Sequence, residues 1–215
     1  MKGSRTQKSV TNTVVSFASQ LIVILLGFLS RRVLIYSVGV EYLGINGLYT
    51  SILDVLSLTE LGLADVVIFS LYKPLAEDDT EKLTALMGYY KVIYRIIALT
   101  VGVIGVALVP VLGVLIKTEI DRFHLVLYYL MFLTNSVCSY LLVYKSSIIQ
   151  ADQKRYLISK YTMAFKLLTT AVQIFVLLVL RSFTVYLTIQ ITMTAIKLKM
   201  NAQLPANFAM ASAAR

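Results

Sequence analysis

The chain consists mainly of long apolar runs separated by short polar or charged segments. A helix needs about 20 apolar residues to cross a bilayer, and no run shows the alternating pattern of a barrel strand. We predict transmembrane helices at residues 14–36, 44–71, 92–115, 123–144 and 161–180. A sixth run, 183–196, reaches about 21 Å and is short for a hydrocarbon core of about 30 Å. The predicted fold is an all-α integral membrane bundle of about six transmembrane helices.

The composition agrees with a membrane protein. Of 215 residues, 58% are hydrophobic and 14% are charged, whereas soluble domains carry about 25% charged residues. The net charge of +9 reflects basic residues near the ends of the predicted helices, which favours membrane orientation over nucleic-acid binding. The lysine and arginine bias between alternate segments places the N-terminus in the cytoplasm. We therefore expect a multi-pass protein of a bacterial plasma membrane.

The remaining composition offers little chemistry. Cys138 and His124 are each alone, so we expect no disulfide, no metal site and no cofactor. No phosphate-binding glycine loop or nucleophile elbow is present, so we expect no enzymatic activity. Residues 1–200 are predicted to form the membrane unit, and the alanine-rich segment 201–215 is predicted to be a disordered tail.

Arg31 and Arg32 lie near the end of the first apolar run. Charges inside a bilayer are costly and mark candidate functional sites. One interpretation is that their long side chains reach the outer headgroups. The other is that at least one faces a hydrated cavity and binds an anion, because guanidinium meets phosphate oxygens bidentately. The two point about 100° apart around a helix, so they are not equivalent.

Three acids interrupt the second run. Asp54 and Asp65 are three helical turns apart and would share one face of a continuous helix, whereas Glu60 would point elsewhere. Asp54 is the deepest and the best candidate to pair with an arginine of the first helix. The alternatives are a substrate-binding role and a purely structural pairing that holds the first two helices together.

A basic and aromatic cluster lies at the start of the third predicted helix. Lys91 and Arg95 form an i,i+4 pair, as do Tyr90 and Tyr94. An interfacial belt explains them, and so does the binding of an anionic lipid headgroup. The complete set of candidate substrate-binding residues is Arg31, Arg32, Asp54, Glu60, Lys91 and Arg95.

Several segments in the first half resemble Wzx-like polysaccharide flippases of the MOP exporter superfamily. They are 30–35 (SRRVLI), 39–48 (GVEYLGINGL), 58–64 (LTELGLA), 70–76 (SLYKPLA), 89–91 (YYK) and 94–97 (YRII). The resemblance covers about residues 10–110, and the later runs match mainly in hydropathy. Members of this family run about twice this length, so the chain resembles an N-terminal lobe truncated after about residue 196.

The resemblance implies a function and a fold. The implied fold has two six-helix lobes around a cationic cavity. The implied function is to flip undecaprenyl-pyrophosphate-linked oligosaccharide across the membrane for the synthesis of cell-surface polysaccharide. Arg31 matches the position that contacts the pyrophosphate in related flippases. The expected partners are this substrate, membrane lipids, and either a second copy or a missing C-terminal lobe. The alternatives are a multidrug or cation antiporter of the same superfamily, for which the two arginines have the wrong sign, and an inactive membrane fragment.

Overall fold

The computed structural model describes residues 5–57, 62–116, 118, 120–152 and 155–213, and this part of the chain contains helices and no strand. Nearly all of the residues that the structure describes are helical, as the long apolar runs predict. The helices are α1 (Arg5–Val38), α2 (Val40–Ser57), α3 (Leu63–Ala76), α4 (Thr80–Ala107), α5 (Val109–Leu115), α6 (Arg122–Ala151), α7 (Arg155–Leu180) and α8 (Phe183–Ala213). The predicted all-α class is confirmed.

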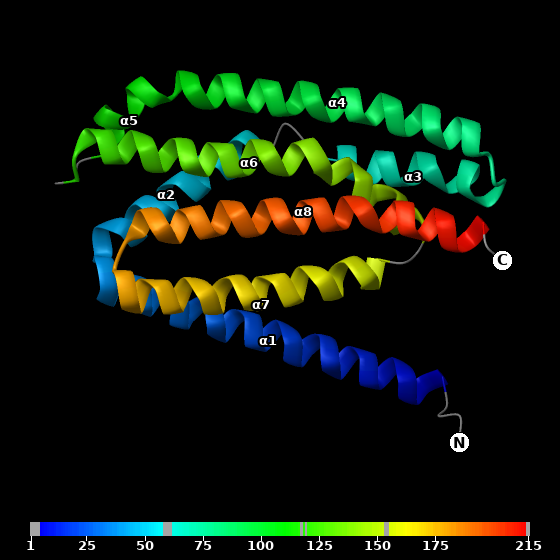
Figure 1. The fold of residues 1–215 in the computed structure, drawn as a ribbon, viewed down its shortest axis with the longest axis horizontal. Coiled ribbons are helices and arrows are strands. Elements are labelled where there is room, and N and C mark those ends of the chain that lie inside the picture. Colours follow the sequence, from blue (N-terminus) through cyan, green and yellow to red (C-terminus); the bar gives the residue numbers. More distant parts are fainter. Residues whose placement is uncertain (1–4, 58–61, 117, 119, 153–154, 214–215) are drawn as a thin grey trace.

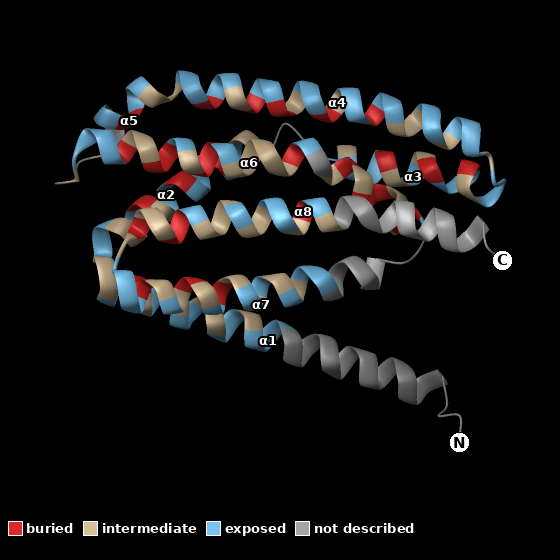
Figure 2. Ribbon diagram, in the orientation of Figure 1, coloured by how far each residue is buried: buried red, intermediate tan, exposed pale blue. Residues whose placement is uncertain are grey.

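The long helices lie side by side along one direction, and α1 begins at the same end of the bundle at which α8 ends (Figure 1). Helix α6 is central, because it packs against α2, α3, α4 and α8. Helix α7 packs against α8 and α1. Figure 2 shows buried residues on α6 and on the side of α4 turned toward it, with exposed residues on the outer side of α4.

Four helical segments are long and apolar enough to cross a membrane, among the residues that the structure describes. They are Gln20–Val38, Thr80–Gly113, Arg122–Leu141 and Tyr161–Leu180. Large apolar side chains on them are exposed, including Phe28 and Phe175, each at 66%, and Leu99 at 69%. Such an apolar exterior is unfavourable in water and suits lipid. These helices indicate a membrane protein.

The second predicted helix is not continuous. Helix α2 ends at Ser57, α3 begins at Leu63, and Gly62 before it has a φ of +81°. A left-handed residue cannot continue a right-handed α-helix. The prediction that Asp54 and Asp65 share one face of a single helix is therefore wrong. Glu60 lies outside the described residues.

Several other helices extend beyond their predicted bounds, α4 and α8 the furthest. Helix α4 begins at Thr80 rather than at residue 92, because Asp79 caps it by accepting a hydrogen bond from the Lys82 backbone amide at 2.9 Å. Helix α8 continues past residue 196 to Ala213. It thus includes most of the segment that the sequence led us to expect to be disordered.

Candidate binding site

A polar cleft of about 340 Å³ lies between α2 and α6 and reaches α8. Its polar lining consists of Thr50, Asp54 and Ser57 from α2, Asn135, Ser136, Ser139 and Tyr140 from α6, and Gln190 from α8. The apolar lining consists of Leu53, Phe132 and Val143. Helical spacing brings the polar groups together, because residues three and four apart share a face. Most residues that line the cleft are therefore polar, although the helices around it are largely apolar.

Three hydroxyl groups of the cleft have already used their protons. Thr50, Ser57 and Ser139 each donate to a backbone carbonyl three or four residues earlier, at 2.7, 2.7 and 2.9 Å. A hydroxyl has one proton to donate and two lone pairs that accept. Toward a ligand, these three side chains therefore offer acceptors rather than donors.

Asp54 and Asn135 add to this surplus of acceptors. The Asp54 side chain is exposed, and no ion pair joins it to a basic group of the described residues. The Asn135 side-chain oxygen Oδ1 is buried and has no hydrogen-bond partner. An unsatisfied buried polar atom costs about 1–3 kcal/mol. The Asp54 carboxylate thus suits a group that donates hydrogen bonds or carries positive charge, while the amides of Asn135 and Gln190 bring N–H donors to the same lining.

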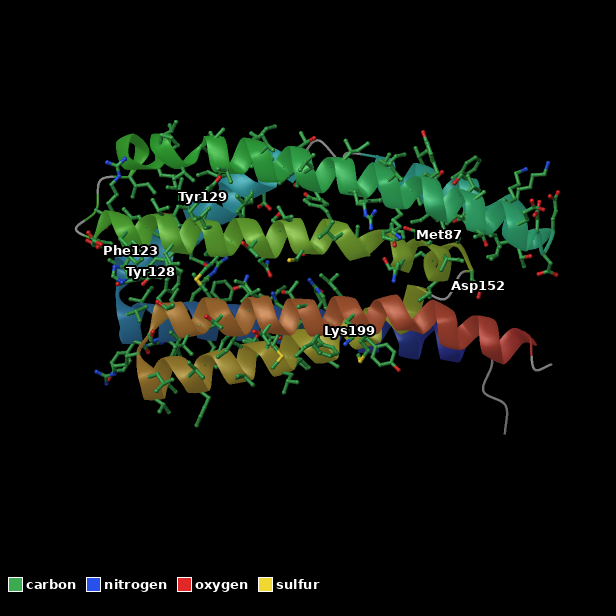
Figure 3. All side chains as sticks on the ribbon, turned by 45° about the horizontal axis from the view of Figure 1, so that its top comes forward. Met87, Phe123, Tyr128, Tyr129, Asp152 and Lys199 are labelled. Carbon is green, nitrogen blue, oxygen red and sulfur yellow. The ribbon has the colours of Figure 1, made fainter. Side chains whose placement is uncertain are left out.

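An aromatic cluster joins the helices next to the cleft. The Phe183 ring of α8 lies 4.9 Å from Tyr128 of α6 and 5.1 Å from Tyr42 of α2, measured between ring centroids. Phe183 also stacks with Tyr186 at 5.7 Å. In Figure 3, Tyr128 lies near the end of α6 where α8 begins, whereas Tyr129 lies on the side nearer α4. Such aromatic pairs stabilise a contact by about 0.5–1.5 kcal/mol each.

The two arginines lie elsewhere. Arg31 and Arg32 are both exposed on α1, and neither lines the polar cleft. At 1.5 Å per residue, Arg31 lies about 10 Å from the turn between α1 and α2, whereas Asp54 lies about 20 Å from it. The expected pairing of Asp54 with one of these arginines is absent from the ion pairs of the described residues. The difference in depth explains why.

The basic residues of α4 also lie apart from the cleft. Lys91 and Arg95 are exposed, while Tyr90 and Tyr94 of the same helix are buried, so the two i,i+4 pairs occupy different faces. Arg95 lines a second cavity of about 650 Å³ between α4 and α6, whose other lining residues are mostly apolar. Of the six candidate residues, the structure brings only Asp54 into the polar cleft, and Glu60 lies outside the described residues.

Most residues that line the cleft were not predicted from the sequence, because the prediction relied on charged side chains within apolar runs. Asn135, Ser136, Ser139 and Gln190 are neutral, and they cost less in an apolar run than an ionised group does. A signal was present, since Asn135, Ser136 and Ser139 form a polar stripe at helical spacing within an apolar run. Comparison with protein families, with curated proteins and with solved structures finds no match to this chain.

Proposed function

We propose that the protein is a transport lobe that moves lipid-linked oligosaccharide from the cytoplasmic to the outer leaflet of a bacterial plasma membrane. The cargo would be an undecaprenyl-pyrophosphate-linked unit for cell-surface polysaccharide. The sequence resemblance of residues 10–110 supports this proposal, and so does a helical bundle with an apolar exterior and a polar cleft. The proposed topology has about six spans with the N-terminus in the cytoplasm.

The exposure of Arg31 carries the proposal. Arg31 lies on the candidate span Gln20–Val38, its side chain is exposed, and no carboxylate of the described residues pairs with it. A guanidinium held in this way is available to a diphosphate, whose oxygens it meets bidentately. A pyrophosphate crossing a membrane needs such fixed cations to replace its water.

The observation that favours a second candidate is the charge of the cleft. Asp54 is the ionisable acid in its lining, and a carboxylate in a membrane bundle suits the binding of a proton, a metal cation or a cationic drug. A cation antiporter would need Asp54 and not Arg31, whereas the flippase needs Arg31. Substituting each residue separately therefore distinguishes the two functions.

The test is translocation of a fluorescent lipid-linked oligosaccharide in vesicles that contain the full chain. Charge-assisted hydrogen bonds contribute about 1.5–3 kcal/mol, so Arg31→Ala should lower the rate at least about tenfold. Arg32→Ala should have a smaller effect, since it points about 100° away. Arg122→Ala is the matched control, because Arg122 is an exposed arginine at the start of α6. Equal tolerance of the Arg31 and Arg32 changes would contradict the proposal and favour headgroup contact.

A single lobe does not enclose a cavity of the proposed kind, so we propose that it works with a second lobe or a second copy of itself. Repeated lobes that face each other around a central site are common in transporters. Chemical crosslinking in native membranes should capture a dimer or a complex. Recovery of monomers alone would contradict this part of the proposal.

A further inference from the structure

We infer that the groove between α4 and α6 binds one anionic phospholipid, with the lipid phosphate at Arg95 and one acyl chain along the apolar lining. The groove is the cavity of about 650 Å³ described above, a volume within the range of about 300–1,000 Å³ that is typical of ligand pockets. It shares no lining residue with the polar cleft, and no residue of α1 lines it. The inference therefore stands independently of the oligosaccharide cargo.

The groove follows two helices and faces the outside of the bundle. Its lining runs from Arg95 to Val106 on α4 and from Leu130 to Leu141 on α6, at helical spacing on both. Leu99 and Val106 are exposed, as are Leu130 and Leu141. In Figure 2 the outer side of α4 is largely exposed along its length. A lipid chain beside the bundle can therefore enter the groove from the side.

The length of the groove matches one leaflet of a bilayer. From Arg95 to Val106, at 1.5 Å per residue, the groove is about 16 Å long. A hydrocarbon core is about 30 Å thick, so each leaflet contributes about 15 Å of it. Arg95 lies close to the start of the apolar run 92–115, which places it near the boundary of the core. A lipid with its headgroup at Arg95 would thus extend its chain toward the midplane.

Basic residues gather at one end of the groove. Helices α4 and α6 run in opposite directions (Figure 1), and Tyr94 stacks with Tyr144 at 6.4 Å between ring centroids, so Arg95 is at the end nearest Tyr144. Lys91 and Lys145 continue the two lining stripes one turn beyond the groove at this end. No ion pair of the described residues joins these three basic residues to a carboxylate. Their charges are therefore available to a headgroup.

Charge selects the lipid, because the chain alone does not. Lipid tails are as apolar as the lining, so a chain gains little when it moves from the bilayer into the groove. The guanidinium of Arg95 meets phosphate oxygens bidentately, and an unpaired charge at this depth is costly. A zwitterionic headgroup would bring a further cation next to three others. A headgroup with a net negative charge compensates them instead.

The inference is tested by fluorescence quenching of the full chain in vesicles of equal parts phosphatidylglycerol and phosphatidylcholine. The chain contains no tryptophan, so Leu99→Trp places a single reporter at the rim of the groove. One lipid at a time carries brominated chains, which quench tryptophan on contact. One basic residue near the membrane surface contributes about a fivefold preference for an anionic lipid, so Leu99→Trp should report a relative binding constant for phosphatidylglycerol of about five or more. Phe175→Trp on α7, which is similarly exposed and does not line the groove, should report about one.

Further variants of the Leu99→Trp protein assign the preference to the basic end of the groove. Arg95→Gln should lower the relative binding constant about fivefold, whereas Arg95→Lys should keep most of it because the charge remains. Arg122→Gln is the matched control, since Arg122 is exposed at the start of α6 and does not line the groove. A constant near one for Leu99→Trp, or equal losses in Arg95→Gln and Arg122→Gln, would overturn the inference. Quenching of Leu99→Trp by neither lipid would overturn it as well, and would indicate that a second copy or another lobe covers the groove.

Discussion

Helices α4 and α6 pack tightly at Gly105, and adding one methyl group there tests the packing of the bundle. A Cβ atom at Gly105 would collide with the side chain of Leu133, at 2.8 Å from Cδ2 and 3.2 Å from Cγ, with Cδ1 nearer still. Leu133 is only 4% exposed. The helices cannot separate freely, since Tyr129 donates a hydrogen bond to the Gly105 carbonyl at 3.0 Å. In Gly105→Ala, Leu133 must therefore leave its rotamer or α4 must withdraw.

The expected loss of stability in Gly105→Ala is the difference between two opposing effects. Overpacking a core costs about 1–3 kcal/mol, while alanine gains up to about 1 kcal/mol over glycine within a helix. Gly102→Ala is the matched control, because its Cβ would meet only Val137 at an ordinary 3.7 Å. Gly105→Ala should therefore be less stable than Gly102→Ala by about 1–3 kcal/mol. At about 2–4 °C per kcal/mol, a difference of about 2 kcal/mol separates the two Tm values by roughly 4–8 °C.

Thermal unfolding in detergent provides the measurement, and a double variant identifies the cause. Leu133→Ala alone should cost about 2–5 kcal/mol by leaving a cavity. Combined with Gly105→Ala it should cost less than the sum, because the new methyl group then occupies part of that cavity. Strict additivity, or equal Tm values for Gly105→Ala and Gly102→Ala, would refute the proposed collision.

Two further predictions concern the backbone break and the contact between α3 and α4. Gly62→Ala should lower the free energy of unfolding by about 1–2 kcal/mol, because Gly62 has a φ of +81°, which an alanine adopts only with strain. An added Cβ would meet no atom within 4 Å, so no collision contributes to this loss. Gly47→Ala, in open space within α2, should not lower it, and comparing the two Tm values tests this. The Ser70 hydroxyl lies 2.6 Å from the Tyr90 hydroxyl and 2.8 Å from the Val67 carbonyl, so Tyr90 is the donor to Ser70. Tyr90→Phe should cost about 0.5–1.5 kcal/mol, and in Ser70→Ala the same change should cost less; equal losses in both backgrounds would argue against this bond.

The hydrophobic pattern predicted the helices correctly where an apolar run forms one unbroken helix. The runs 123–144 and 161–180 lie within α6 and α7, because a long apolar segment must satisfy its own backbone hydrogen bonds. The pattern failed at residues 44–71. An apolar run has the same appearance whether a glycine within it is helical or left-handed, so the break at Gly62 was not visible.

The candidate site was predicted only where it carried charge. Asp54 was identified because an acid in an apolar run is costly, and it does line the cleft. Its partners could not be inferred in the same way, since which face of α6 meets α2 depends on packing between helices far apart in sequence. The arginines of α1 were identified on the same principle, yet charge alone does not give depth, and the structure sets them apart from Asp54.

The aromatic cluster bears on how a ligand could enter or leave the cleft between α2 and α6. Tyr128 lies one turn before Phe132, and Tyr186 one turn before Gln190, and both later residues line the cleft. The rings therefore occupy the space just beyond one end of it, where α6 and α8 begin. A ligand leaving by that end must separate several packed rings, at about 0.5–1.5 kcal/mol for each pair. If α1 starts in the cytoplasm, as we propose, this end of the cleft faces outward, and we expect exchange with the outside to require that these rings separate.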